Sequence, residues 1–219
     1  MTRDDVPWDW VKGRARNLSG LQRALVSAGV AVLLLTPPAW ACQYCDQAQA
    51  PHLAPRQLLD RGEIVVNLIN RHPVYHVDVY GLIDGSVDDV WAAITTYDRY
   101  EDFLPLVTES SLRQRVGNLV HQYVKVRPPW PLQEHWMLNA NLEKRKEGLL
   151  RFNMTDGNLR SEHGFWHLTP WSEHQTRLHY HVSLDPWLDF VPGWVIEFGT
   201  KVVIPDIVKG VRRRVKNRQ

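Results

Sequence analysis

The pattern of hydrophobic and polar residues changes period at Ser86, and this change predicts the first main elements of the fold. Residues 74–83 alternate in character, which predicts a half-buried strand. One face of this strand carries Tyr75, Val77, Val79, Gly81 and Ile83, and the other carries His76, Asp78 and Tyr80. Beyond Ser86 the apolar residues recur at helical spacing, as Val87, Val90, Trp91 and Ile94. Ser86 and Asp89 are placed to cap this helix.

A run of strands is predicted after a second, aromatic-rich helical turn at residues 97–103, which ends before Pro105. Turn signals separate predicted strands at 108–116, 119–126, 134–144, 149–155, 162–169 and 177–184, with a short leading strand at 63–69. The predicted core face of 134–144 carries Trp136, Leu138, Ala140 and Leu142. Hairpins with one apolar face pair into an antiparallel sheet.

The C-terminal stretch, residues 190–218, returns to a helical period. Its apolar stripe contains Val191, Val195, Phe198 and Val202, and Pro205 predicts a kink or a break. A curved antiparallel sheet wrapped around this long helix would bury the apolar surface of both. The predicted class is therefore α+β, with a cavity between sheet and helix.

Several motifs resemble those of the START-like, or polyketide-cyclase and coenzyme-Q-binding (SRPBCC), superfamily. They are Val87-Asp88-Asp89-Val90-Trp91, Tyr97-Asp98-Arg99-Tyr100, Phe103-Leu104-Pro105, Trp166-His167-Leu168-Thr169-Pro170, and Pro192 with the helix after it. The resemblance spans residues 63–215 and implies a helix-grip fold, also called START/Bet v-like. Members of the superfamily bind lipids, isoprenoid quinones, sterols or polyketides, and some catalyse cyclisation or hydrolysis. The fold alone does not choose among these functions.

The N-terminal residues 1–41 have the pattern of a secretory signal peptide. A basic segment precedes the apolar run 24–35, and the stretch ends in Ala39-Trp40-Ala41. The run is short for a membrane span, which needs about 20 apolar residues. Export, to the periplasm of a bacterium, is the preferred interpretation, and an uncleaved anchor through residues 24–35 is the alternative.

Both cysteines, Cys42 and Cys45, follow directly and begin a predicted linker at residues 42–62. A local disulfide fits an oxidising compartment. Lipidation of Cys42 and a redox site are the alternatives, although Pro51 and Pro55 do not suit the helix that a redox motif requires. Residues 63–219 form the predicted ligand-binding domain.

Composition and charge narrow the function only slightly. With 44% hydrophobic and 23% charged residues among 219, the chain can build one core of ordinary size. The net charge of +2, without a dominant basic block in the body, favours no nucleic-acid partner. Ten tryptophans suit either a core or an apolar cavity.

The predicted ligand contacts are bulky aromatic residues and a few polar residues expected to point inward. They are Trp91, Phe103, Tyr123, Trp136, Arg151, Asn153, Trp166, Tyr180, Trp194 and Phe198. Several of the aromatic residues serve equally well as core. Access to the cavity would be gated by residues 97–105 or by the proline-rich loop 128–131.

Four histidines could invite a metal interpretation, because His163 with His167 and His179 with His181 share strand faces. If Trp166 pairs with Tyr180, His167 lies beside His179. No cysteine or carboxylate completes the set in the sequence, so solvent-side histidines are preferred and no metal is predicted. The chain also lacks a nucleophile elbow, a phosphate-binding loop and a dinucleotide fingerprint, so no catalytic residue or cofactor is predicted.

The basic C-terminal end has two interpretations of equal weight. Its cations are Lys209, Arg212, Arg213, Arg214 and Lys216. They suit the negative end of the helix dipole, and they also suit an anionic membrane surface. The preferred function is binding of a hydrophobic small molecule, with transport of that molecule as its extension. A cyclase or aromatase acting in the same groove is one alternative, and a membrane-associated interaction protein with a filled interior is another.

Overall fold

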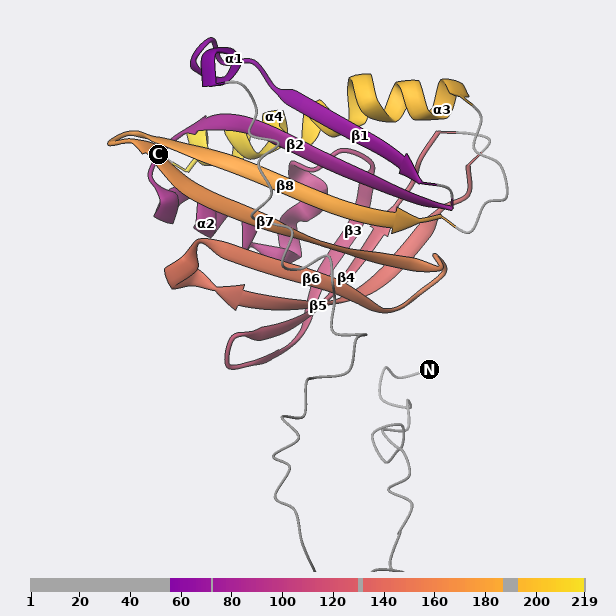
Figure 1. Ribbon diagram of the computed structural model, residues 1–219. Helices are drawn as coiled ribbons and strands as arrows, with labels where there is room; N and C mark the ends of the chain where they lie inside the picture. The colour runs from indigo at the N-terminus through magenta and orange to yellow at the C-terminus, as the bar shows by residue number, and fades with distance from the viewer. Residues whose placement is uncertain (1–55, 72, 130–131, 187–192, 219) are drawn as a thin grey trace, which may run out of the picture. The chain divides into compact units, whose positions relative to one another are not determined.

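The sheet has eight antiparallel strands in the order β1-β2-β8-β7-β6-β5-β4-β3 (Figure 1). Its strands are β1 (Val65–Arg71), β2 (Val74–Asp84), β3 (Val107–Val116), β4 (Leu119–Val126), β5 (His135–Lys144), β6 (Leu149–Gly157), β7 (Ser161–Ser172) and β8 (Gln175–Asp185). The computed structural model describes residues 56–71, 73–129, 132–186 and 193–218. The predicted export segment and both cysteines lie outside these residues.

The helical segments are α1 (Arg56–Asp60), α2 (Val87–Ile94), η3 (Tyr97–Asp102), η4 (Arg145–Glu147), α3 (Gly193–Phe198), η5 (Gly199–Val203) and α4 (Ile204–Lys216). Most of them lie between β2 and β3 or after β8, while α1 precedes β1 and η4 lies between β5 and β6. Buried residues of α2, η3 and α4 share one hydrophobic core with the inner face of the sheet. The predicted α+β helix-grip fold is confirmed, as are the six strands after η3.

The predicted cap at Ser86 is present and complete. The Asp89 amide donates to Ser86 Oγ at 3.2 Å, and the Ser86 amide donates to Asp89 Oδ2 at 3.0 Å. These reciprocal bonds satisfy two amides that the first helical turn cannot pair internally. The change of period at Ser86 therefore marks the start of helix α2.

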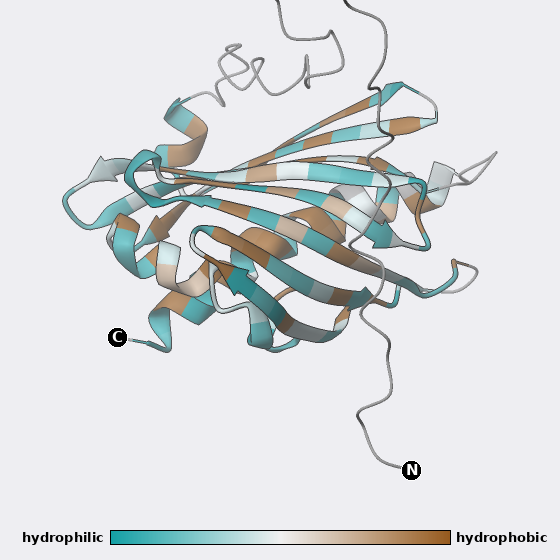
Figure 2. Ribbon diagram, turned by 90° about the horizontal axis from the view of Figure 1, so that it is seen from below, coloured by the Kyte–Doolittle hydropathy of each residue, from teal (hydrophilic) through white to brown (hydrophobic). Residues whose placement is uncertain are grey.

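The strand β2 is buried on both faces, so the prediction of a half-buried strand is wrong. Tyr80 and Leu82 of its outer face pack with Leu59 of α1 in a second, smaller core. Residues 56–62, which the sequence assigned to a linker, thus contribute a buried side chain. Figure 2 shows the alternation of brown hydrophobic and teal hydrophilic positions along the strands.

The predicted core face of β5 is also wrong. Met137, Asn139 and Asn141 are the buried residues, whereas Trp136 and the other residues of its parity are only partly buried. The inner face of β5 carries two amide side chains, so the face with more apolar residues is the outer one.

The C-terminal helix continues through Pro205 without a break, and of the predicted kink or break only an irregular turn before it is present. Its irregularity lies one turn earlier, where η5 is a π-helix, and Pro205 sits in the first turn of α4. Proline has no backbone N–H to donate to the preceding turn, and the helix changes from the π-helical to the α-helical pattern at this point. The wider π-helical turn shifts the apolar stripe, so Val202 is 43% exposed and Ile204 faces the core instead. In the described residues no helix is both long enough and apolar enough to cross a membrane.

Candidate functional site

Two adjoining cavities lie between the sheet and the C-terminal helix. The larger, about 310 Å³, is the apolar chamber; its walls include Leu68, Val77, Leu106, Leu159, Leu184 and Ile204. The smaller, about 160 Å³, is the polar chamber, and its walls include Tyr100, Gln122, Asn139, Asn141, Glu162 and Tyr180. Val126, Met137 and Glu162 line both chambers.

The strand pattern explains why one chamber is polar. Side chains two residues apart share a strand face, so Gln122 of β4 and Asn139 and Asn141 of β5 all point inward. Gln122 is 1% exposed and Asn141 is 3% exposed. Burying amides costs free energy unless they are hydrogen-bonded, so their partners define this wall of the site.

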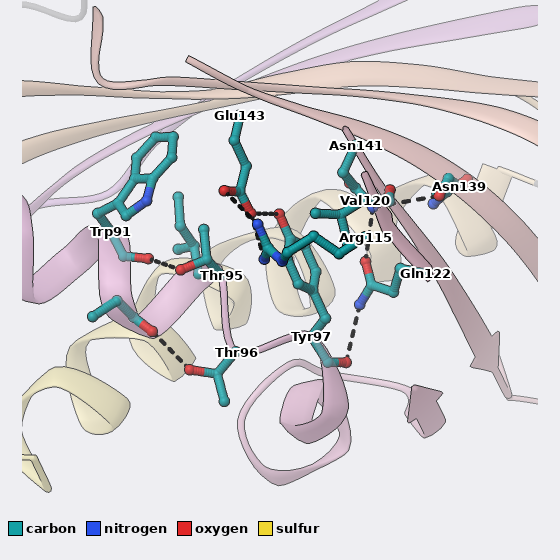
Figure 3. Close-up of polar contacts among 12 residues, drawn as sticks. Trp91, Thr95, Thr96, Tyr97, Arg115, Val120, Gln122, Asn139, Asn141 and Glu143 are labelled. Carbon is teal, nitrogen blue, oxygen red and sulfur yellow. Dashed lines mark hydrogen bonds and ion pairs between the residues drawn. The ribbon is translucent and has the colours of Figure 1, made fainter. Parts of the chain in front are cut away.

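A hydrogen-bond network joins this wall to η3 (Figure 3). Asn141 Nδ2 donates to Gln122 Oε1 at 3.4 Å, and Gln122 Nε2 donates to the carbonyl of Tyr97 at 3.2 Å. The Tyr97 hydroxyl donates to Glu143 Oε1 at 2.8 Å, and both Glu143 oxygens accept from Arg115 at 2.9 Å. Burial and the nearby Tyr100 and Glu143 raise the pKa of Tyr97, so its hydroxyl stays a donor.

Glu162 of β7 is the carboxylic acid of the site. Its carboxyl group is hydrogen-bonded to Asn139, and its Oε2 atom is buried with no hydrogen-bond partner among the described residues. The same holds for Asn139 Oδ1 and His135 Nδ1, whose side chains also line the chambers. Burial raises the pKa of Glu162 to about 7, against the lowering effect of Asn139. Buried polar atoms without partners thus gather at this site.

Two of the predicted ligand contacts, Trp166 and Tyr180, line the polar chamber. Their registry is as predicted, since Trp166 pairs with Tyr180 and His167 with His179. The two rings lie 4.3 Å apart. Their contact with a ligand stays a prediction.

Four other predicted contacts lie on the opposite face of the sheet, so their predicted inward orientation is wrong. Tyr123 and Trp136 stack there at 6.2 Å, while Gln122 and Met137 take the inward positions. In β6, Leu150 and Phe152 are buried, which places Arg151 and Asn153 outward. A register error of one residue exchanges the two faces of a strand.

The remaining four predicted contacts lie in the core or on the C-terminal helix. Trp91 and Phe103 are both 5% exposed and pack in the main core, outside the described walls of the two chambers. Trp194 is 48% exposed and so does not point inward, and Phe198 is partly buried. Their neighbours Val195 and Gly199 line the apolar chamber instead.

Both predicted gates contribute to the chamber walls. Leu104 and Pro105 line the polar chamber, and Pro128 lines the apolar chamber; residues 130 and 131 lie outside the described part. The helical part of the first gate is held tightly, since the Tyr100 amide donates to Ser110 Oγ at 2.9 Å and its hydroxyl donates to the carbonyl of Ile94 at 2.6 Å. Gating itself stays a prediction.

The outer face of the sheet carries His163, His167, His179 and His181, and Asp78 of β2 contacts the last two. Asp78 Oδ1 lies 2.7 Å from His179 Nε2 and 3.0 Å from His181 Nδ1. Hydrogen bonds from both rings hold the pKa of Asp78 well below its usual range, despite burial. Within the described residues no group of three or more His, Cys, Asp or Glu side chains could hold a metal ion.

Several cations of the C-terminal end make contacts within the domain. Arg212 donates to the carbonyls of Leu82 at 2.8 Å and Gly62 at 3.1 Å. Arg214 lies 3.8 Å from Asp102, and Lys209 lies 2.8 Å from Asp206. These contacts give the cluster a role in packing the helix, and docking on a membrane stays a prediction.

The sequence does not single out the amide and carboxyl side chains of the polar chamber, which are Gln122, Asn139, Asn141 and Glu162. Asn139 and Asn141 are separated by one residue, as Gln122 is from apolar Val120 and Val124. Polar residues at alternate positions on a strand can mark a wet cavity wall as well as a solvent face. The alternating polar residues are visible in the sequence. Only the position of the C-terminal helix shows that they line a cavity and not the outer surface.

The comparisons with known proteins agree with this architecture. The family model described as polyketide cyclase / dehydrase and lipid transport matches residues 83–212. A STAR-related lipid transfer protein from Xanthomonas axonopodis is 16% identical, with a TM-score of 0.58 over 70% of this chain and 92% of that one. A START superfamily protein from Mycobacterium smegmatis is 14% identical, with a TM-score of 0.56 over 66% and 99%.

A third similar structure is the Zhui aromatase/cyclase from a Streptomyces species, 11% identical, with a TM-score of 0.55 over 66% of this chain and 95% of that one. No curated protein matches the chain in sequence. At these identities the structural likeness shows the fold alone, whereas the family model covers more than half of the chain. The chain therefore belongs to the polyketide cyclase / dehydrase and lipid transport family.

Proposed function

We propose that this protein binds one hydrophobic small molecule, such as a lipid, an isoprenoid quinone or a sterol-like compound, between the sheet and the C-terminal helix. The observation that carries the proposal is the apolar chamber of about 310 Å³ between the sheet and the helical segments α3, η5 and α4, adjoining a polar one. Ligand sites are typically apolar clefts of about 300 Å³ or more with a few fixed polar groups. This combination fits an amphiphile, with its apolar body in the larger chamber.

Carriage between membranes is the finer part of this proposal. The similar lipid transfer protein from Xanthomonas axonopodis supports it. The export pattern of residues 1–41 supports a site of action outside the cytoplasm, in the periplasm of a bacterium. N-terminal sequencing of protein recovered from fractionated cells tests export: a chain starting at Cys42 agrees with it, and an intact Met1 in the cytoplasm contradicts it.

The test of binding is native mass spectrometry of gently purified protein, followed by organic extraction. We expect a bound lipid, quinone or sterol-like molecule at unit stoichiometry, released by the solvent. Protein that carries nothing, and that takes up none of these classes when they are offered, contradicts the proposal.

An enzyme of the cyclase or aromatase type is the second candidate, and Glu162 is the observation that favours it. A carboxyl group with a pKa of about 7 in a cavity can both accept and give a proton at neutral pH. The similar aromatase/cyclase structure supports the same idea. Recovery of a chemically altered, cyclised product after incubation with a polyketide analogue, lost in Glu162→Gln, would favour the enzyme over the carrier.

A further inference from the structure

The position of Glu162 bears on which ligands the chambers can accept. It is one of three residues that line both chambers, and the other two, Val126 and Met137, are apolar. A molecule that occupies the apolar chamber and reaches the polar one must therefore pass beside this carboxyl group. Its Oε2 atom has no hydrogen-bond partner in the part of the chain that the structure describes.

The electrostatics of the chambers oppose a charged ligand. The other titratable groups among the described wall residues are Tyr75, Tyr100, Tyr180 and His135, and no lysine or arginine is among them. Burial lowers the pKa of His135, so this ring stays neutral at pH 7. An anionic head group placed here would be desolvated beside an acid with no cation to balance it, which is unfavourable.

We propose that the Glu162 carboxyl group donates a hydrogen bond to the polar end of the ligand, and that the ligand is therefore an uncharged amphiphile carrying a carbonyl or hydroxyl oxygen. This inference rests on the proposed binding function and deepens it. Asn139 and Tyr180 flank the carboxyl group and supply further polar contacts in the same chamber. The apolar body then fills the larger chamber.

The affinity for such a ligand should fall as the pH rises. The protonated carboxyl donates, whereas the carboxylate cannot and repels an oxygen acceptor. Only the protonated fraction of the protein binds well, and this fraction falls as the pH rises through about 7. Affinity for an uncharged ketone should therefore fall by about tenfold or more between about pH 6 and about pH 8.5.

The experiment compares three probes of matched chain length: dodecane, decyl methyl ketone (dodecan-2-one) and dodecanoate. Binding is measured by calorimetry at both pH values for wild type, Glu162→Gln and Glu162→Leu. We expect wild type to prefer the ketone at the lower pH. Glu162→Gln should keep ketone binding and lose the pH dependence, because an amide still donates. Glu162→Leu should bind the ketone about five- to tenfold more weakly than wild type and keep its affinity for dodecane.

The hydrocarbon separates the two ways in which the inference can fail. If none of the three proteins binds dodecane or the ketone, the proposed binding function fails, and this inference fails with it. If dodecane binds but Glu162→Leu holds the ketone as tightly as wild type, only the role of Glu162 is overturned. Dodecanoate binding as tightly as the ketone at the higher pH overturns the exclusion of anions.

Discussion

At the residue scale, the Glu162 carboxyl group makes the stability of the fold depend on pH. Its pKa of about 7 lies above the ordinary 4.5, so the folded state holds a proton that the unfolded chain loses between these values. Stability contributed by this group is thus full below about pH 4.5 and falls as the pH rises to about 7. A shift of this size corresponds to roughly 3 kcal/mol at most.

Glu162→Gln should therefore stabilise the fold at alkaline pH. We expect the free energy of unfolding of the variant to exceed that of wild type by about 1–3 kcal/mol near pH 8 and to match it near pH 4.5. Urea denaturation at the two pH values measures this difference. A variant less stable than wild type at pH 8 would show that the charged carboxylate is satisfied in the fold.

Ser86 is a second residue whose contribution can be isolated. Ser86→Ala removes the oxygen that accepts the Asp89 amide, and we expect a loss of about 1 kcal/mol in unfolding free energy. Ser86→Thr keeps that oxygen and is the matched control. Equal losses in both variants would mean that the cap contributes little.

At the element scale, the C-terminal helix approaches its neighbours very closely. A Cβ atom built on Gly210 would lie 1.9 Å from the carbonyl oxygen of Phe103, which belongs to backbone and cannot rotate away. Gly210→Ala should therefore separate α4 from the end of η3 and destabilise the fold by about 1–3 kcal/mol. Gly193→Ala, whose Cβ atom would meet no atom of the described residues within 4 Å, is the control and should change thermal stability little. Similar melting temperatures for the two variants would contradict this close packing.

The order of the elements could be predicted from the sequence because it depends on local signals. The cap at Ser86, the proline after η3 and the turns between strands each have a local physical cause. The inner faces of β4, β5 and β6 could not be predicted reliably, because both faces of these strands mix apolar and polar residues. The large apolar side chain of Trp136 suggested that its face of β5 lies in the core. Asn139 and Asn141, on the other face, line the cavity. The π-helical turn likewise has no signal in a period count.

At the scale of the whole molecule, the outer face of the sheet should make the fold sensitive to acid. Burial lowers the pKa values of His76, His163, His167 and His179 below 6.5. The unfolded chain therefore binds protons more readily, so the stability they contribute is present above about pH 6.5 and is lost as the pH falls. Glu162→Gln lacks the carboxyl group whose contribution to stability changes with pH in the opposite direction. We expect the melting temperature of this variant to drop steadily as the pH is lowered from about 7.5 to about 5. A melting temperature independent of pH in this range would contradict the assigned shifts.

A hydrophobic molecule that occupies the apolar chamber must lose its site when a larger side chain fills that chamber. Val195 lines the chamber, whereas Val202 on the same helix is 43% exposed. Binding of an apolar fluorescent probe is titrated for wild type, Val195→Trp and Val202→Trp, with circular dichroism confirming that each is folded. We predict one site per chain in wild type and in Val202→Trp, and at least tenfold weaker binding in Val195→Trp, because the new side chain fills the space. Undiminished binding by folded Val195→Trp would contradict the account.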